Sequence, residues 1–168
     1  ILAADEGASA LRSLTTATTA AAGWVAIAAD RATGAAVVLA IAEGTAELRT
    51  FDPVTGTLGP ARRAPLGLLA GGRTRGVRAS WLSPGGARFA VWGDVPRGAI
   101  ELDAASVLGP LLPGADRTIQ DVLYTDDGVL AASAAGVERF ARVGGALVAQ
   151  TTPLTEASGR LLDLGRGR

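Results

Sequence analysis

The chain has 168 residues and a formal net charge of zero, which is enough length for one domain with a sizeable core and gives no long-range attraction to nucleic acid. Hydrophobic residues make up 48% of the chain and charged residues 19%, which excludes a disordered tail and favours a packed globule. Cys and His are absent, which excludes thiolate and imidazole catalysis, disulfides and Cys/His zinc sites.

The basic residues indicate the genomic background of the chain. All 16 are Arg, and neither Lys nor Asn occurs. Codons for Lys and Asn are rich in A, whereas codons for the abundant Ala, Gly, Arg and Pro are rich in G and C. We therefore expect a bacterium with a GC-rich genome, and this bias carries no functional information.

The hydropathy of the chain and its first residue give expectations about membrane insertion and export from the cell. The longest uncharged apolar run spans residues 35–42, far short of the roughly 18 residues of a membrane span. The chain starts at Ile1 rather than Met, so we expect a processed product, a trimmed chain or an excerpt of a longer protein. A mature exported protein that has lost its leader fits this start, and export to the periplasm, cell envelope or exterior is favoured.

The first 22 residues predict a partial repeat. Their Ala-rich part, residues 8–22, has good intrinsic helix propensity, so a short helix is an option there. Elsewhere 23 Gly and 8 Pro leave almost no uninterrupted window of about 12 to 15 residues, the length that an isolated helix needs. This composition argues against a helical repeat and favours an all-β fold.

Residues 23–67 predict the first complete repeat. One apolar strand reaches a tight turn at Gly34, a second strand ends at Gly44, and a third, alternating strand runs into the turn FDPVTG. The weaker segment TLGPARRA, residues 57–64, is the predicted fourth strand.

Residues 76–118 and 119–154 predict two more repeats of the same order. Their first tight turns are SPGG and TDDG, in which Ser, Pro and Asp favour the early turn positions and Gly tolerates a positive φ. Their predicted third turns and fourth strands are SVLGP (106–110) with LLPGADRTI (111–119), and RVGG (142–145) with ALVAQTT (146–152).

Four glycines mark the same position in successive repeats, each opening an alternating strand. They are Gly7, Gly44, Gly98 and Gly136, separated by 37, 54 and 38 residues. The mean period of about 43 residues, with four short strands in each, is typical of a propeller blade. A single small sheet cannot bury both faces, so we expect neighbouring sheets to stack around an axis.

Two turn motifs carry a resemblance to a known class of repeat. The phrase WLSPGGARFAVWG resembles the SPDG turn of WD40-like, TolB-like and YVTN-type propeller repeats, and FDPVTGTL resembles their D-x-x-T-G link between third and fourth strands. The Trp-Asp and Gly-His pairs of WD40 repeats proper are missing. The resemblance implies an all-β protein, a β-propeller with four-stranded antiparallel blades of about 43 residues.

The number of blades stays open. The partial repeat at 1–22 and the terminal stub at 155–168 are expected either to combine in one blade, giving four blades, or to belong to a larger ring of six to eight blades. The shortness of the stub favours the larger ring, of which this chain is one segment.

The acidic residues are expected to have structural roles. Asp126 and Asp127 lie in DDGVLAAS, which lacks the alternating oxygens of a calcium loop and is typical of a hairpin turn. Asp52 in FDPVTG is expected to cap its own turn by accepting hydrogen bonds from backbone amides. The sequence therefore predicts no catalytic, cofactor-binding or metal-binding residues and no cofactor.

One basic segment is a candidate interaction loop, because it contains no acidic residue and accounts for part of the longest glycine interval. Such a loop suits an acidic protein surface or an anionic polymer, while a solvated loop is the simpler interpretation. The arginines are Arg62, Arg63, Arg73, Arg75 and Arg78.

The function expected from the sequence is a non-catalytic propeller that acts as a protein-interaction scaffold in a larger, possibly envelope-associated, bacterial assembly. The alternatives are part of a propeller hydrolase that uses carboxylates or calcium, and a sensor domain that binds a small ligand. The expected partners are proteins, with no nucleic acid and no membrane span, and a small-molecule ligand stays open.

Overall fold

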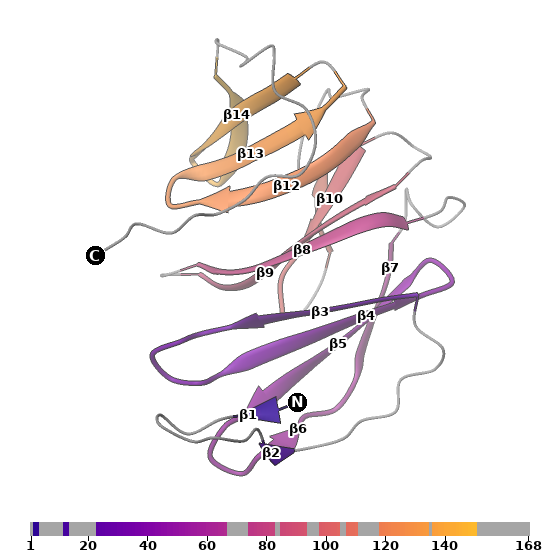
Figure 1. Ribbon diagram of the computed structural model, residues 1–168, viewed down its shortest axis with the longest axis vertical. Helices are drawn as coiled ribbons and strands as arrows, with labels where there is room; N and C mark the ends of the chain where they lie inside the picture. Colours follow the sequence, from indigo (N-terminus) through magenta and orange to yellow (C-terminus); the bar gives the residue numbers. More distant parts are fainter. Residues whose placement is uncertain are drawn as a thin grey trace.

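The computed structural model describes residues 2–3, 12–13, 23–66, 74–82, 85–93, 98–104, 107–110, 118–134 and 136–150, and their regular structure is antiparallel β-sheet (Figure 1). The all-β prediction with sheets of about four strands is confirmed. Near the start of the chain, β1 (Leu2–Ala3) pairs with β2 (Arg12–Ser13) in a separate two-stranded ribbon. Apart from β2, the option of a helix at 8–22 lies outside the described residues.

The first sheet contains strands β3 to β7. β3 (Trp24–Ala29), β4 (Ala36–Ala42) and β5 (Thr45–Asp52) form a meander of three consecutive antiparallel strands. The free edge of β5 pairs with two short strands, β6 (Thr57–Leu58) and β7 (Arg62–Pro65). The predicted fourth strand is therefore present in two pieces.

The break between β6 and β7 follows from the local sequence. The amide of Gly59 still donates to the carbonyl of Thr50 over 2.8 Å, which continues the ladder one step beyond β6. Pro60 has no N–H to donate, so regular pairing cannot run through it. Pairing resumes at Arg62, opposite Leu48.

The second sheet has the order β8 (Thr74–Leu82), β9 (Gly86–Gly93), β10 (Gly98–Leu102) and β11 (Val107–Pro110). Its last strand corrects the sequence prediction, because the segment assigned to the third turn is itself the fourth strand. The chain reverses earlier, between Leu102 and Val107, without the Gly-Pro step that suggested a turn. Of the predicted fourth strand at 111–119, only its last residue belongs to a described strand, and that strand is the next one.

The third sheet has the order β12 (Ile119–Thr125), β13 (Gly128–Ser133), β14 (Gly136–Val143) and β15 (Ala146–Ala149). Its last strand falls within the predicted range. The turn before β15 is made by Gly144 and Gly145, which have φ angles of 58° and 88°. Glycine adopts this left-handed conformation without the Cβ strain that other residues carry.

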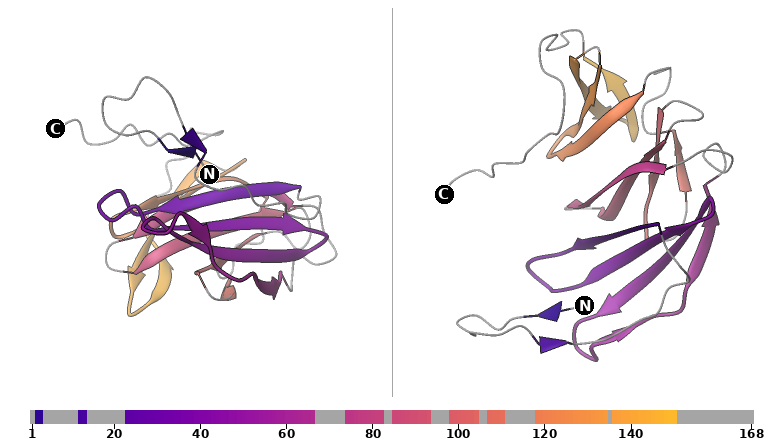
Figure 2. Two further views of the ribbon diagram at one scale, coloured as in Figure 1. Left: turned by 90° about the horizontal axis from the view of Figure 1, so that it is seen from below. Right: turned by 45° about the vertical axis from the view of Figure 1, so that its right-hand side comes forward.

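The three sheets are stacked face to face (Figure 1), and they fan out in the right-hand view of Figure 2. Strand β9 shows how the sequence produces the stack: Phe89 and Val91 belong to the core shared with the first sheet, whereas Ala90 and Trp92 belong to the core shared with the third. Side chains alternate between the two faces of a strand, so a strand covered on both faces must be apolar throughout.

Contacts between neighbouring sheets gather at their first strands, β3, β8 and β12. Each of these is an edge strand of its own sheet, and no ladder joins one to the next. Among the described strands, none of the third sheet pairs with the first sheet, so these strands form an open stack without ring closure.

Candidate interaction surface

One face of β3 is apolar and open to solvent. Side chains of Ala26 and Ala28 point into the core shared with the second sheet, so the alternate residues point the other way. Val25 is 58% exposed and Ile27 is 50% exposed, and Ala29 beside them is exposed too. We call Val25, Ile27 and Ala29 the open face of β3.

The corresponding faces of the other two first strands are covered. On β8, the side that points back to the first sheet carries Val77, Ala79 and Trp81, which are partly buried and pack against the shared core. On β12, the side that points back to the second sheet carries Val122 and Tyr124, which are buried. The open face of β3 is therefore a position at which the fold elsewhere places a neighbouring sheet.

The exposure is greatest on the first strand. On the same face of the first sheet, Ala36 and Ala40 of the adjacent strand β4 are 7% and 5% exposed, and Val38, opposite Ile27, is half-buried. Single exposed apolar side chains are normal on protein surfaces, but two large ones in adjacent positions along one face of an edge strand are a candidate contact.

Side chains join the first strands to one another across the stack. The indole N–H of Trp24 at the start of β3 donates to the carbonyl of Thr74 on β8 over 3.2 Å. The Nε of Arg78 on β8 donates to the carbonyl of Val122 on β12 over 3.0 Å. Each bond brings a side-chain donor from one sheet to a backbone carbonyl on the edge strand of the next.

Arg78 also forms an ion pair with a buried carboxylate. Its terminal nitrogen lies 2.8 and 2.7 Å from the two carboxylate oxygens of Asp121, which is 3% exposed as a residue. One of those oxygens also accepts the amide of Val122 over 2.9 Å. The carboxylate is thus held in place by its partners from two sheets, which suits a structural role.

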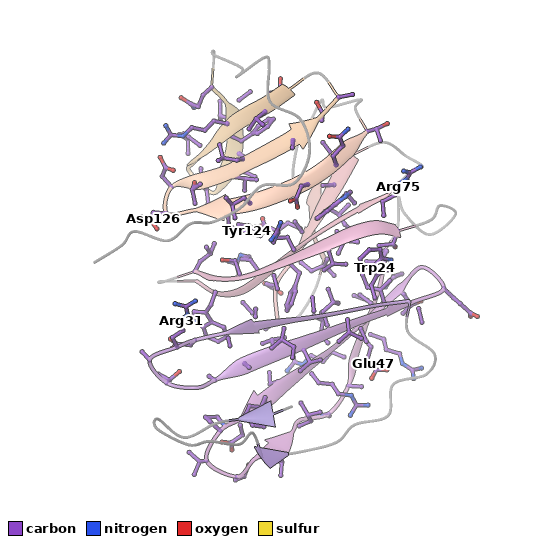
Figure 3. All side chains as sticks on the ribbon, viewed as in Figure 1. Trp24, Arg31, Glu47, Arg75, Tyr124 and Asp126 are labelled. Atoms are coloured by element: carbon purple, nitrogen blue, oxygen red, sulfur yellow. The ribbon has the colours of Figure 1, made fainter. Side chains whose placement is uncertain are left out.

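A second polar network lies inside the interface between the second and third sheets. Glu101 on β10 is 5% exposed and accepts from Arg142 over 2.8 Å and from the hydroxyl of Tyr124 over 3.3 Å. Arg88 lies 4.0 Å from the same carboxylate, and its buried Nε makes no hydrogen bond. Figure 3 shows Tyr124 between β12 and the second sheet.

The environment of Tyr124 keeps its hydroxyl protonated. Burial raises the pKa of this phenol, and the negative charge of Glu101 raises it further. A phenol of this kind donates a hydrogen bond at every physiological pH and does not act as a base. The Glu101 network therefore holds two sheets in register.

The acidic turn residues have the structural roles that the sequence predicts. Asp52 accepts from the amides of Val54 and Thr55 over 2.8 and 3.3 Å, and these bonds lower the pKa of its carboxyl group. Asp127 lies in the β12–β13 turn, accepts from the hydroxyl of Thr125 and pairs with Arg139; these partners lower its pKa as well. Figure 3 shows Asp126 at the tip of this hairpin.

The predicted arginine loop is divided between two strands. Arg62 and Arg63 lie exposed on β7, and Arg63 lies 3.5 Å from Glu47. Arg75 and Arg78 lie on β8, where Arg78 is committed to Asp121. Arg73 lies outside the described residues. An interaction through these arginines stays a prediction, and the structure adds a sheet-joining role for Arg78 that the sequence did not indicate.

A small cleft lies between the first and second sheets, at the end of the stack where β4 begins and β5 and β8 end. Its volume is about 290 Å³, and its lining residues include Phe51, Trp81, Arg88 and Asp103. Ligand pockets usually start near this volume and are mostly apolar with a few polar groups.

The open face of β3 is absent from the sequence-based predictions, because the segment WVAIAA does not show that one of its faces is uncovered. Both alternating sets of this strand are apolar, the pattern of a strand covered on both faces. In the structure only one of those faces has a neighbouring sheet. The open face is identified by combining the two observations: both faces of β3 are apolar, but a neighbouring sheet covers only one of them.

Within the described part of the chain, no group of three acidic side chains is placed to hold a metal ion. No helix found there has the length and hydrophobicity to cross a membrane.

Comparisons with known proteins give no relative: no protein-family model, curated protein or solved structure matches the chain.

Proposed function

We propose that this protein is a non-catalytic segment of a β-propeller that acts as a protein-interaction scaffold, and that the open face of β3 binds a partner through an apolar β-sheet face. The observation that carries the proposal is the exposure of Val25 and Ile27 at a position whose equivalents on β8 and β12 are covered by a neighbouring sheet.

The propeller interpretation is supported by the arrangement of the strands. Three consecutive meanders, each about four strands wide, stack through their faces and bring their first strands together. Asp52 caps the FDPVTG turn at the link between the third and fourth strand positions, where the D-x-x-T-G resemblance places it. Export stays a prediction from the start of the chain at Ile1, and a GC-rich bacterial source stays a prediction from composition.

The non-catalytic interpretation is supported by the use of the acidic side chains. Asp52 and Asp127 stabilise turns, Asp121 joins two first strands, and Glu101 lies between two arginines inside a sheet interface. Each of these carboxylates is held by donors from its own fold, so none of them is poised as a free base or nucleophile.

The energetics of the open face favour a partner. Burying a Val or Ile side chain fully is worth about 1.5 to 3 kcal/mol, so covering two that are half exposed contributes about 2 kcal/mol. That gain does not hold a complex together by itself, but it adds to the backbone and rim contacts that any sheet-on-sheet interface makes.

The test is site-specific photocrosslinking in cells that express the protein. A photoreactive amino acid at Ile27 is expected to crosslink one defined protein, and the neighbouring substitution Val25→Glu is expected to abolish the crosslink. The same group at Val54, which is 92% exposed in a turn, is the control and is expected to capture nothing specific. Equal labelling from both positions contradicts the proposal.

A second candidate function, the sensing of a small ligand, is favoured by the cleft beside Trp81. Trp81 and Arg88 in the lining of this cleft suit an anionic aromatic molecule of modest size. Anilinonaphthalenesulfonate is a suitable probe: its fluorescence on binding is expected to fall several-fold with Trp81→Ala and to persist with Ile27→Glu. If the fluorescence instead falls with Ile27→Glu and persists with Trp81→Ala, the dye binds the open face of β3, and the cleft is no longer a candidate ligand site.

A further inference from the structure

We infer that the partner binds the open face of β3 as an extended segment, which adds as one β-strand to the free edge of β1 and lays small apolar side chains on Val25 and Ile27. This inference rests on the proposed function, which places a partner on that face, and it adds the form in which the partner binds. The site is made of described strands, and nothing in it depends on where the sequence begins or ends.

The β1–β2 ribbon corresponds to part of a further repeat. It lies on the outer side of the first sheet, the side away from the second sheet (Figures 1 and 2). Aligning Gly7 with Gly44, 37 residues further along, places β1 on residues 39–40 of β4 and β2 on residues 49–50 of β5. The ribbon therefore holds the second and third strand positions of its sheet.

Among the described strands, none lies in the first position beside β1. β1 pairs with β2 along one edge, and no described strand pairs with its other edge. In the three larger sheets the first position is held by β3, β8 and β12, and these strands carry the contacts from sheet to sheet. By the same geometry, a strand added beside β1 meets β3 at its open face.

The free edge of β1 favours an extended segment as the occupant. The N–H and C=O groups along an unpaired strand edge are a template for another strand. Partners that bind in this way gain affinity from main-chain hydrogen bonds and specificity from alternate side chains. Neighbouring strands in the three larger sheets all pair antiparallel, so we expect the added strand to run antiparallel to β1.

The side chains of the added strand follow from the interface between the first and second sheets. There the earlier strand, β3, contributes Ala26 and Ala28, and the later strand, β8, contributes the larger Val77 and Trp81. The open face is the later side of an interface of the same kind, and it likewise carries large side chains. The complementary strand therefore has Ala or another small apolar residue at alternate positions.

The first experiment measures the binding of a labelled peptide to the purified chain by fluorescence anisotropy. The peptide is AGWVAIAADR, a copy of residues 22–31, which presents alternate alanines on one face when extended. We expect saturable binding of one peptide per chain. Ile27→Glu in the protein is expected to weaken binding at least tenfold, and Val54→Glu, a charge added at an exposed turn, is expected to leave it unchanged.

The second experiment separates strand addition from simple apolar contact, and it uses the natural chain. Two further peptides carry N-methyl groups on alternate amides, so that each blocks one edge of the extended peptide and keeps every side chain. An N-methyl group removes the backbone donor and obstructs a neighbouring strand. We expect one of the two peptides to lose binding at least tenfold and the other to bind like the parent, because only one edge faces β1.

The possible results have different consequences. If the parent peptide does not bind, or if N-methylation of both edges or of neither edge abolishes binding, strand addition is overturned. Self-association of the chain that Ile27→Glu abolishes would make a second copy the occupant, which also overturns the inference. Circular dichroism of Ile27→Glu checks that its sheets are intact.

Failure of this inference is distinguishable from failure of the proposed function. A specific crosslink from Ile27 in cells, combined with no effect of N-methylation, leaves the proposed function standing and overturns strand addition. Peptide binding as expected, without a specific crosslink in cells, removes the proposed function and retains the strand site.

Discussion

At the scale of single residues, charged side chains in this protein mainly hold its own structure together. Asp30 is representative: it accepts from the amide of Ala32 and the hydroxyl of Thr33, and these bonds lower the pKa of its carboxyl group. Asp52 and Asp127 repeat this arrangement in other turns. With Lys absent, Arg supplies every side-chain cation, and its planar guanidinium suits the two-oxygen contact with Asp121.

The turn at Asp52 predicts a pH dependence. Its pKa is lowered in the fold below the ordinary value of 3.8, so its contribution to stability is present above about pH 4 and is lost as the pH falls through the folded pKa. Asp52→Asn keeps an acceptor oxygen but cannot titrate. In urea unfolding, we expect the natural chain to be the more stable at pH 7 and the difference to shrink by pH 3.

A control for this experiment is Glu43→Gln, an exposed residue in the β4–β5 turn. This variant should follow the natural chain at both pH values. If the difference in unfolding free energy between the natural chain and Asp52→Asn is the same at pH 7 and pH 3, the turn carboxylate makes no such contribution.

The ion pair between Arg78 and Asp121 predicts an asymmetry between its two partners. Asp121 is 5% exposed and Arg78 34% exposed as side chains, so removing Arg78 leaves a buried charge, whereas removing the carboxylate leaves a cation that reaches water. We expect Arg78→Met to lower the free energy of unfolding by about 3 kcal/mol and Asp121→Asn by about 1 kcal/mol. The double variant should lose less unfolding free energy than the two single variants together. Equal losses in the two single variants would contradict the argument.

At the scale of elements, glycine serves two different needs in the hairpins. The β4–β5 turn is made by Glu43 and Gly44, with φ angles of 47° and 72°, the left-handed pair that matches the twist of a two-residue hairpin. Gly128 at the start of β13 has no such φ. A Cβ there would lie 1.9 Å from the carbonyl oxygen of Phe140 on the paired strand, so close approach of two backbones requires this glycine.

Gly128→Ala is therefore expected to destabilise the third sheet strongly. The obstructing atom is backbone rather than a side chain that can rotate, so we expect a loss of about 3 kcal/mol or more in the free energy of unfolding. Gly23→Ala is the matched control, because its nearest neighbour would lie 3.9 Å away. Thermal unfolding followed by circular dichroism compares the two, and similar losses would contradict the clash.

At the scale of the whole molecule, stability is graded along the stack. The second sheet is the only described sheet with an apolar core on each face, and Phe89, Ala90 and Val91 of β9 have no measurable exposure. β3 and β15 lie at the edges of the first and third sheets and expose Ile27 and Val148. Interfaces between neighbouring sheets carry the stability of such an array.

This gradient predicts the pattern of native-state hydrogen exchange. Amides of β9 are expected to exchange slowest, at rates that approach global unfolding, and those of β3 and β15 faster by at least tenfold. Uniform protection across all three sheets would contradict a graded stack.

The sequence by itself determined the elements of this protein, because their signals are local. Alternating apolar residues predicted the strands, glycine and aspartate marked the turns at 30–35, 51–56 and 126–128, and the roles of Asp52 and Asp127 followed from turn chemistry. The error at 106–110 arose because Gly-Pro reads as a turn, although an edge strand tolerates both residues.

Only the tertiary structure decided which partners those elements meet. Arg78 and Asp121 are 43 residues apart, and no local pattern relates them until β8 and β12 lie side by side. The open face of β3 is likewise invisible locally, since WVAIAA has the composition of a strand covered on both sides. Whether an apolar face is covered depends on the number of neighbouring sheets, which is a property of the stack and not of the strand.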